Sequence, residues 1–244
     1  MRYSKTLIPT MKNIPTEAKI ISHQLMLKSG LIKKVSSGFF HYLPIGLLII
    51  NKISKIIKEE INKIGGQEIL MPLVQSAKLW KETKRWYKYG NLLFKLKDRK
   101  KNIFCLAPTH EEIITDLIRC FVKTYKQLPL ILYQIHNKFR DEIRPKSGLL
   151  RSREFLMNDT YSFDINKKKA KESYRILSKT YYKIFQKCGL NFKIALASSG
   201  QIGGNNSHEF HALSNNGEDI IVSCTNCNYS ANIEIAEVAK KKIK

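Results

Sequence analysis

Arginine, lysine and glutamate gather in two short runs that a loop separates. The first run, KFRDE, covers residues 138–142, and the second, RSREF, covers residues 151–155. Apolar and polar residues alternate on both sides of a break that contains Pro145 and Gly148. This pattern predicts an antiparallel hairpin with a long loop, extending over residues 131–163.

Side chains two positions apart on a strand lie on the same face, so the hairpin is expected to gather its charges on one surface. That surface would comprise Lys138, Arg140, Glu142, Arg151, Arg153 and Phe155. Guanidinium groups bind phosphate oxygens through paired hydrogen bonds, and a phenyl ring offers a flat surface on which a base can stack. The pattern indicates a nucleotide site, and the alternative is a surface hairpin with fortuitous arginines.

The charge of the chain is strongly unbalanced. Among 244 residues, 43 Lys and Arg stand against 20 Asp and Glu, which gives a formal net charge of +23. Such an excess favours polyanionic partners, with nucleic acid as the first candidate. Solvated lysine-rich helix faces that reflect compositional bias are the alternative reading of any single run. The length suffices for one large domain, or for one domain with appendages.

Cysteine usage and hydropathy define the expected compartment. The five cysteines are an odd number scattered along the chain, which argues against a disulfide framework and predicts a reducing cytoplasm. The longest apolar stretch, residues 43–50, is too short to span a bilayer. Residues 1–12 lack the apolar segment of a secretory signal, although their basic composition is compatible with a transit peptide. A soluble, cytoplasmic protein is therefore expected.

Helices and strands alternate along the chain, and hairpins dominate. Helical periodicity predicts helices over residues 16–28, 44–64, 109–122 and 167–188. Strands are expected over residues 35–43, 67–71, 92–96, 103–107 and 131–163, and in the strand-like region 192–235. This order predicts an α+β fold in which helices flank an antiparallel sheet.

A second polar constellation opens the helix predicted from residue 109. Thr109 and Glu112 have the spacing of a capping box, T-x-x-E, ahead of an apolar helix. That interpretation accounts for both residues structurally and leaves Glu111 free.

Two further motifs carry weaker signals. Cys224 and Cys227 form half of a zinc site, but structural zinc needs four ligands and there is no second C-x-x-C. His208 and His211 are the nearest candidates, yet residues three apart on one strand face opposite sides. A turn with two free thiols is the alternative, and no metal site is predicted. The glycines of residues 200–204 match neither G-x-x-x-x-G-K-[ST] nor G-x-G-x-x-G, the two spacings of phosphate-binding loops. They indicate a turn.

Several of these motifs, in this order, resemble bacterial prolyl-tRNA synthetases, which are class II aminoacyl-tRNA synthetases, over residues 1–236. GGQEILMP at residues 65–72 resembles the class II motif 1, and FRDE through RSREF resembles motif 2. PTHEE at residues 108–112 resembles the proline-recognition loop. IGG at residues 202–204, followed by SHEF at residues 207–210, resembles a further active-site strand.

The resemblance implies an activity and a set of roles. The family activates proline with ATP and Mg²⁺ to prolyl-adenylate and transfers the prolyl group to tRNA(Pro). Arg140 would contact the α-phosphate and the proline carboxylate. For the ATP, Glu142 would accept from the adenine amino group, Arg151 would hold the γ-phosphate and Phe155 would stack on adenine. Thr109 and Glu111 would bind the proline ammonium, while His208 would line the pocket without transferring a proton.

The same resemblance implies an organisation. Residues 65–72 would build a homodimer interface. Residues 1–223 would form the N-terminal part of the catalytic domain, and residues 224–244 would be a lysine-rich tail where the editing insertion begins. The editing, motif 3 and anticodon-binding regions of the family are absent from the chain. Two alternatives follow: an inactive, basic RNA-binding or dimerisation remnant, and one half of a split synthetase.

The loop of motif 2 departs from the family pattern. Relatives usually carry arginine and phenylalanine where this chain has Lys146 and Ser147. Lysine is a poorer bidentate partner than arginine. Because this loop approaches the tRNA acceptor end in the family, altered contacts with the terminal nucleotides are expected.

Overall fold

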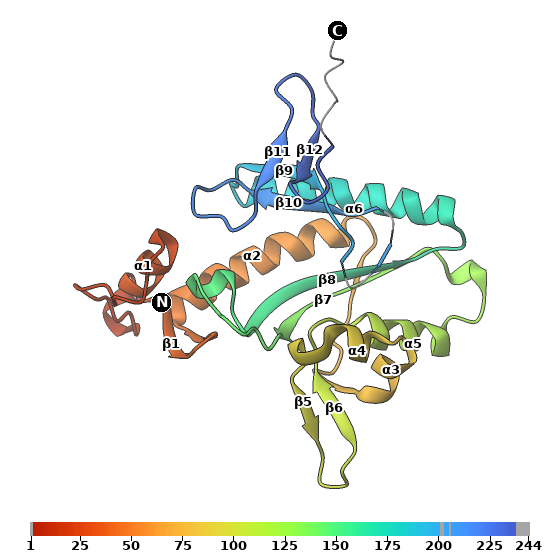
Figure 1. Cartoon of the computed structure of the whole chain (residues 1–244), viewed down its shortest axis with the longest axis horizontal. Coiled ribbons are helices and arrows are strands. Elements are labelled where there is room, and N and C mark those ends of the chain that lie inside the picture. Colours follow the sequence, from red (N-terminus) through yellow and green to blue (C-terminus); the bar gives the residue numbers. More distant parts are fainter. Residues whose placement is uncertain (1, 201–202, 205, 238–244) are drawn as a thin grey trace. The chain divides into compact units, whose positions relative to one another are not determined.

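The computed structural model describes residues 2–200, 203–204 and 206–237 (Figure 1). It divides into two compact units, Met1–Thr180 and Tyr181–Lys244. The long helix α6, Lys167–Lys187, belongs to both units, because the division falls within it. The expected α+β composition is confirmed in both units.

A two-stranded ribbon forms the centre of the first unit. β7, Leu130–Phe139, pairs antiparallel with β8, Glu154–Phe163, in an unbroken register from Leu130 opposite Phe163 to Phe139 opposite Glu154. This ribbon confirms the hairpin predicted over residues 131–163. The short strand β3, Gln67–Glu68, adds to β7 in parallel, so the sheet is mixed instead of purely antiparallel.

The N-terminal segment forms a helix, a hairpin and a longer helix. α1, Ile21–Lys28, is shorter than the predicted 16–28 and follows the one-turn helix η1, Tyr3–Lys5. β1, Ile32–Ser36, and β2, Phe39–Tyr42, make the expected hairpin. α2, Pro44–Asn62, begins at the predicted proline, whose fixed φ and missing N–H suit the first position of a helix.

A small sheet with short helices occupies the middle of the sequence. β4, Val74–Ser76, and β5, Lys95–Lys97, flank β6, Ile103–Leu106, and the β5–β6 pair confirms the predicted strands. Two short helices were not predicted: α3, Ala77–Glu82, and α4, Arg85–Tyr89, which leads into η2, Gly90–Leu92. They bury Trp80 against Tyr89 with ring centroids 5.2 Å apart, around which the local core forms.

Two connecting elements lead into and across the central ribbon. α5, Glu111–Phe121, and η3, Tyr125–Gln127, precede β7. The loop between β7 and β8 contains η4, Gly148–Leu150. Ser147 and Gly148 both have positive φ values, 62° and 65°, and this left-handed turn aims the chain back into β8.

The second unit is a sheet packed on the end of α6. Its strand order is β10, β9, β12, β11, with bounds His208–Ala212, Phe192–Leu196, Ser230–Asn232 and Ile221–Ser223. Phe185 of α6 lies 5.2 Å from both Phe192 and Phe210, measured between ring centroids. This aromatic cluster explains the strand-like composition that the sequence shows after residue 192.

Within the described part of the chain, no helix combines the length and the apolar composition that crossing a bilayer requires.

Gly46 provides a test of the packing of α2. A Cβ atom at Gly46 would collide with the backbone carbonyl oxygen of Leu31. We therefore expect Gly46→Ala to lower the free energy of unfolding by about 1–3 kcal/mol, because overpacking outweighs the better helix propensity of alanine. Asn51→Ala, at an exposed position of the same helix, should leave stability unchanged or slightly raised. Urea unfolding measures both variants, and equal stabilisation by the two would contradict this packing.

Candidate active site

Arg140 lies directly after β7, at the end of the ribbon. Its backbone N–H donates to Arg153 O at 2.9 Å, which continues the β7–β8 pairing beyond the strands. Its Nη2 reaches Pro108 O at 3.5 Å, and its Cζ lies 5.2 Å from the centroid of the Phe155 ring. Nε is buried and has no hydrogen-bond partner among the described residues. The guanidinium is thus held between the Phe155 ring and the 108–111 loop, and its Nε–H remains as a hydrogen-bond donor for a ligand.

Glu142 and Arg151 are brought together across the loop of the hairpin. Arg151 Nε and Nη2 lie 3.1 and 3.0 Å from the same carboxylate oxygen, Oε2 of Glu142. Arg153 Nε also donates to Glu142 O at 2.9 Å. Because the Arg151 side chain is 47% exposed, this ion pair contributes little to stability and a competing ligand can displace it.

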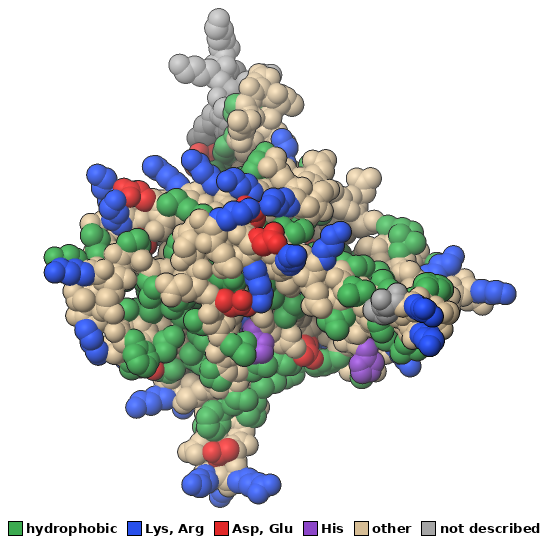
Figure 2. Space-filling view, turned by 180° about the vertical axis from the view of Figure 1, so that it is seen from behind, with side chains coloured by type: hydrophobic (Ala, Val, Ile, Leu, Met, Phe, Trp, Pro, Cys, Tyr) green, Lys and Arg blue, Asp and Glu red, His purple; other side chains and the backbone are tan. Residues whose placement is uncertain are grey.

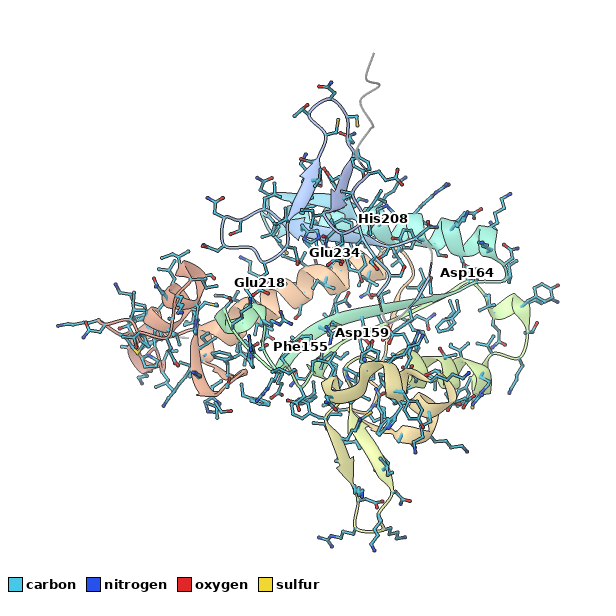
Figure 3. The ribbon with its side chains drawn as sticks, viewed as in Figure 1. Phe155, Asp159, Asp164, His208, Glu218 and Glu234 are labelled. Atoms are coloured by element: carbon cyan, nitrogen blue, oxygen red, sulfur yellow. The ribbon has the colours of Figure 1, made fainter. Side chains whose placement is uncertain are left out.

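A cavity of about 470 Å³ adjoins this ion pair. It is lined by Asn91, Leu92, Asp141, Glu142, Ile143, Arg144, Lys146 and Arg151. Most of these residues come from the β7–β8 loop, which places the loop's cations at a concave surface. Phe155 lies on β8, as Figure 3 shows, together with Asp159 further along the same strand.

Lys138 does not join the surface that its spacing predicted. Its side chain is fully buried, and its Nζ lies 2.7 Å from Asp159 Oδ1. Burial lowers the pKa of Lys138, and the ion pair with Asp159 opposes that shift. The expectation that Lys138 faces a nucleotide is wrong: its face of β7 is covered, so the ammonium can stay charged only beside a carboxylate.

The loop before α5 forms a second polar site. The Thr109 hydroxyl donates to Glu111 Oε2 at 2.5 Å. The peptide that joins Thr109 to His110 is held at both of its polar groups, because Thr109 O accepts from Gln75 Nε2 at 3.0 Å and His110 N donates to the Tyr161 hydroxyl at 3.2 Å. The loop therefore presents a hydroxyl and a carboxylate from a rigid backbone.

The predicted capping box is wrong. The residue at the N-cap of α5 is His110, and the Thr109 hydroxyl bonds Glu111 in place of a helix N–H. Glu112 does not reach back to the cap, since its Oε1 accepts from Arg85 Nη1 at 3.0 Å and from Thr83 at 3.1 Å. Leaving the buried Glu112 carboxylate without a charged partner would cost more free energy than leaving the helix without a cap. The carboxylate therefore pairs with Arg85 instead of capping α5.

The charges of this region are shifted by burial. Desolvation raises the pKa of Glu111, while the hydrogen bond from Thr109 opposes that rise. Burial also lowers the pKa of His110 to about 4, helped by the positive charge of Lys138. His110 is therefore neutral at physiological pH. Its Nε2 lies 3.2 Å from Pro72 O, so the proton of the neutral ring belongs on that nitrogen.

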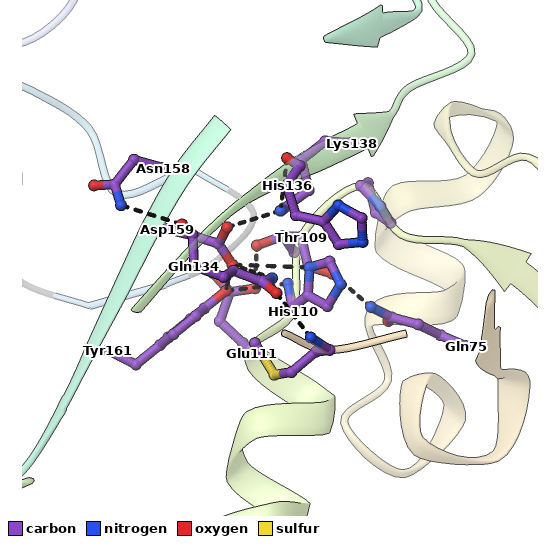
Figure 4. A network of polar contacts seen from close by, with 12 residues as sticks. Gln75, Thr109, His110, Glu111, Gln134, His136, Lys138, Asn158, Asp159 and Tyr161 are labelled. Carbon is purple, nitrogen blue, oxygen red and sulfur yellow. Dashed lines mark hydrogen bonds and ion pairs between the residues drawn. The ribbon is translucent and has the colours of Figure 1, made fainter. Parts of the chain in front are cut away.

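A buried polar network beneath the loop was not predicted from the sequence (Figure 4). Its centre is Asp159, which accepts from Gln134 Nε2 at 2.9 Å and from the Tyr161 hydroxyl at 2.7 Å, besides its ion pair with Lys138. One signal was present: Gln134, His136 and Lys138 are polar at alternate positions of one strand. Such alternation predicts a strand, and here the polar face of that strand is buried at Gln134 and Lys138.

Comparisons with known proteins show to which family the chain belongs. The family described as tRNA synthetase class II core domain (G, H, P, S and T) matches residues 94–244. The chain belongs to this class II synthetase core family. The antiparallel ribbon and its basic loop, predicted to be motif 2, lie within the matched residues.

Named relatives narrow the resemblance within the family. The chain is 55% identical to a proline–tRNA ligase of Geobacter metallireducens over 97% of its own length and 42% of that protein. It is 54% identical to a proline–tRNA ligase of Geotalea daltonii, covering 100% of this chain and 43% of that one. The chain thus spans less than half the length of these relatives.

Solved structures confirm the fold of the class II core. A prolyl-tRNA synthetase from Cryptosporidium parvum, complexed with L-proline and AMP, matches with a TM-score of 0.67 at 19% identity. The match covers 77% of this chain and 38% of that one. A Giardia lamblia prolyl-tRNA synthetase in complex with prolyl-adenylate matches with a TM-score of 0.64 at 23% identity, covering 68% and 35%.

The remaining predicted residues of this class II core lie in the second unit. His208 begins β10 and is exposed there, so its place in the proline pocket stays a prediction. Ile202, in the IGG segment, falls outside the described residues. Cys224 and Cys227 are exposed free thiols at the turn between β11 and β12. No group of three or more potential metal ligands occurs in the part of the chain that the structure describes.

The low pKa of His110 predicts how stability depends on pH. The unfolded histidine takes up a proton near its ordinary pKa of about 6.5, whereas the folded one resists protonation until about 4. Protonation of the unfolded chain should therefore lower the free energy of unfolding by up to about 3 kcal/mol as the pH falls from about 6.5 to 4. NMR titration of the imidazole measures this directly, and a His110 midpoint near 6.5 would contradict the buried site.

Proposed function

We propose that this chain carries the proline- and ATP-binding sites of a proline–tRNA ligase, and that the whole enzyme joins proline to tRNA(Pro). The observation that carries the proposal is that Arg140 contacts the rigid loop, residues 108–111, that presents Glu111. The carboxylate of Glu111, supported by Thr109, is a receptor for a cation, and the unpartnered Nε of Arg140 is a donor for an anion. Arg140 reaches the same loop through Pro108 O. A zwitterionic imino acid has both complementary charges.

ATP would lie along the adjoining end of the ribbon. Phe155 would stack on adenine, Glu142 would accept from its amino group, and Arg151 would hold the γ-phosphate. The exposed ion pair between Glu142 and Arg151 supports these roles, since both partners are preorganised and exchangeable. His208 would line the proline pocket, as the resemblance implies.

Arg140 would act on the reacting centre. As the proline carboxylate attacks the α-phosphorus, negative charge concentrates between the two substrates. A guanidinium held by Phe155 and Pro108 O stabilises that charge without reorganising. No protein nucleophile is required, because positioning and electrostatics supply the rate.

Magnesium would enter with the nucleotide. The described residues contain no cluster that could cage a metal ion, and Mg²⁺ is bound in many ATP sites by phosphates, waters and one or two carboxylates. Asp141 and Glu142, at the loop cavity, are the carboxylates in a position to contribute. The ion would neutralise phosphate charge there.

The surface supports a polyanionic partner. Lys and Arg side chains are spread over the face shown in Figure 2, with few acidic groups among them, and the net charge is +23. These features support a nucleic-acid partner, which in the proposed function is tRNA(Pro). The enzyme would be cytoplasmic, as cysteine usage predicts. The motif 2 loop, with Lys146 and Ser147, would contact the acceptor end.

The proposed assembly and domain organisation follow the family pattern. A homodimer would form through residues 65–72, where Leu70 is 75% exposed. Residues 1–223 would be the N-terminal part of the catalytic domain, and residues 224–244 would be the junction to the editing region. A basic RNA-binding remnant and one half of a split synthetase are the outcomes against which the function is tested.

Proline-dependent exchange of pyrophosphate into ATP tests the activity. The chain, supplied with the C-terminal portion of a proline–tRNA ligase, should catalyse the exchange. Arg140→Ala should reduce the rate at least about a hundredfold, because it removes a preorganised charge at the reacting centre. Arg99→Ala, at an exposed position in the β5–β6 turn, is the matched control and should retain full activity.

Two results would redirect the proposal. If the supplemented chain gives no exchange, while it still binds tRNA with a steep salt dependence, it is an RNA-binding remnant. If exchange occurs but Arg140→Ala behaves like Arg99→Ala, the zwitterion site lies elsewhere.

A further inference from the structure

Tyr161 occupies a position between the buried network and the loop of Thr109 and Glu111. Its hydroxyl donates to Asp159 Oδ2 at 2.7 Å and accepts from the backbone N–H of His110 at 3.2 Å. His110 separates Thr109 from Glu111 in the sequence, so this N–H lies at the centre of the proposed proline-binding loop. One phenolic oxygen thus joins the ribbon to that loop.

Asp159 determines which way the Tyr161 hydroxyl points. The aspartate is itself fixed by Lys138 at 2.7 Å and by Gln134 at 2.9 Å. A phenol has a single proton, and the charged acceptor takes it. The oxygen lone pairs are left for His110 N–H, so the direction of both hydrogen bonds is fixed by the carboxylate.

The hydroxyl also keeps its proton under all physiological conditions. Burial and the negative charges of Glu111 and Asp159 raise the pKa of Tyr161 well above its ordinary value.

We propose that Tyr161 is a positioning residue for proline: its hydroxyl, oriented by Asp159, anchors His110 and so sets the Thr109–Glu111 pair in the geometry that binds the imino acid. This inference rests on the proposed function. Tyr161 would act through the loop and would touch neither substrate. Its loss should therefore affect proline and leave ATP unaffected, because Phe155 and Arg151 lie on the other part of the ribbon and its loop.

Tyr161→Phe removes the anchoring oxygen with little change in shape. In the pyrophosphate exchange assay with the supplemented chain, the KM for proline should rise about tenfold, the equivalent of one lost hydrogen bond to a substrate-binding loop. The KM for ATP should change less than about twofold. In hydrogen-exchange NMR, the His110 amide should exchange faster, since its acceptor is gone.

Tyr133→Phe is the matched control. Tyr133 is fully buried on β7, and its hydroxyl donates to Asn62 at 2.8 Å, away from the 108–111 loop. It loses one buried hydroxyl of the same kind, so any general effect of destabilisation on the assay appears in it as well. Neither KM nor the His110 exchange rate should change in this variant.

The outcomes separate the inference from the function. A wild-type chain without proline-dependent exchange overturns the proposed function, and this inference with it. A wild-type chain that is active, with Tyr161→Phe indistinguishable from Tyr133→Phe in the KM for proline, overturns the positioning role alone. An equal rise of both KM values in Tyr161→Phe overturns it too, because it indicates a general structural effect.

Discussion

The buried ion pair between Lys138 and Asp159 is the interaction on which the site depends. Removing two charges from water costs several kcal/mol for each ion, and only excellent geometry offsets that penalty. Here Asp159 receives an ammonium, an amide and a phenol. Both carboxylate oxygens are thus engaged, and the pair links β7 to β8 from within. Gln134 and the Tyr161 hydroxyl take their orientation from this carboxylate.

The same pair divides the charges of the region into two sets. Lys138 and Asp159 neutralise each other inside the protein. Arg140 and Glu111, nearer the surface of the site, are not paired with each other in any described contact. Such a region is suited to a zwitterion, because each charge of the ligand meets an opposite charge of the protein. No charge is then buried without a partner, which would cost free energy. Arg85 plays the corresponding role for Glu112, which leaves Glu111 for a ligand.

The sequence predicted the elements whose pattern is local. The central ribbon, α2 and α6 were found to within a few residues, because periodicity and the punctuation by proline and glycine are properties of neighbouring residues. α3 and α4 were missed, since helices of one or two turns are too short to show a period and are held by the burial of Trp80. For the site, motif spacing singled out Arg140, Glu142, Arg151 and Phe155, which lie in contact in two pairs at one end of the ribbon, while their roles stay predictions. It gave Lys138 and Glu112 the wrong partners, because Asp159 and Arg85 are 21 and 27 residues away and only the folded chain brings them close.

The network also connects the proposed dimer segment to the amino-acid loop. Met71 N donates to Gln134 Oε1 at 3.0 Å, and His110 Nε2 lies 3.2 Å from Pro72 O. The second contact requires a neutral ring with its proton on Nε2, which leaves Nδ1 as an acceptor 3.8 Å from Asp159, too far for a hydrogen bond. Protonating His110 would place a second cation beside Lys138, which explains why burial and the local charge both oppose it. The neutral histidine thus joins Pro72 to the Thr109–Glu111 loop, while Gln134 joins Met71 to the buried aspartate. The segment at residues 65–72 is therefore connected to the proposed proline-binding loop along two routes, one through this ring and one through Gln134, Asp159 and Tyr161.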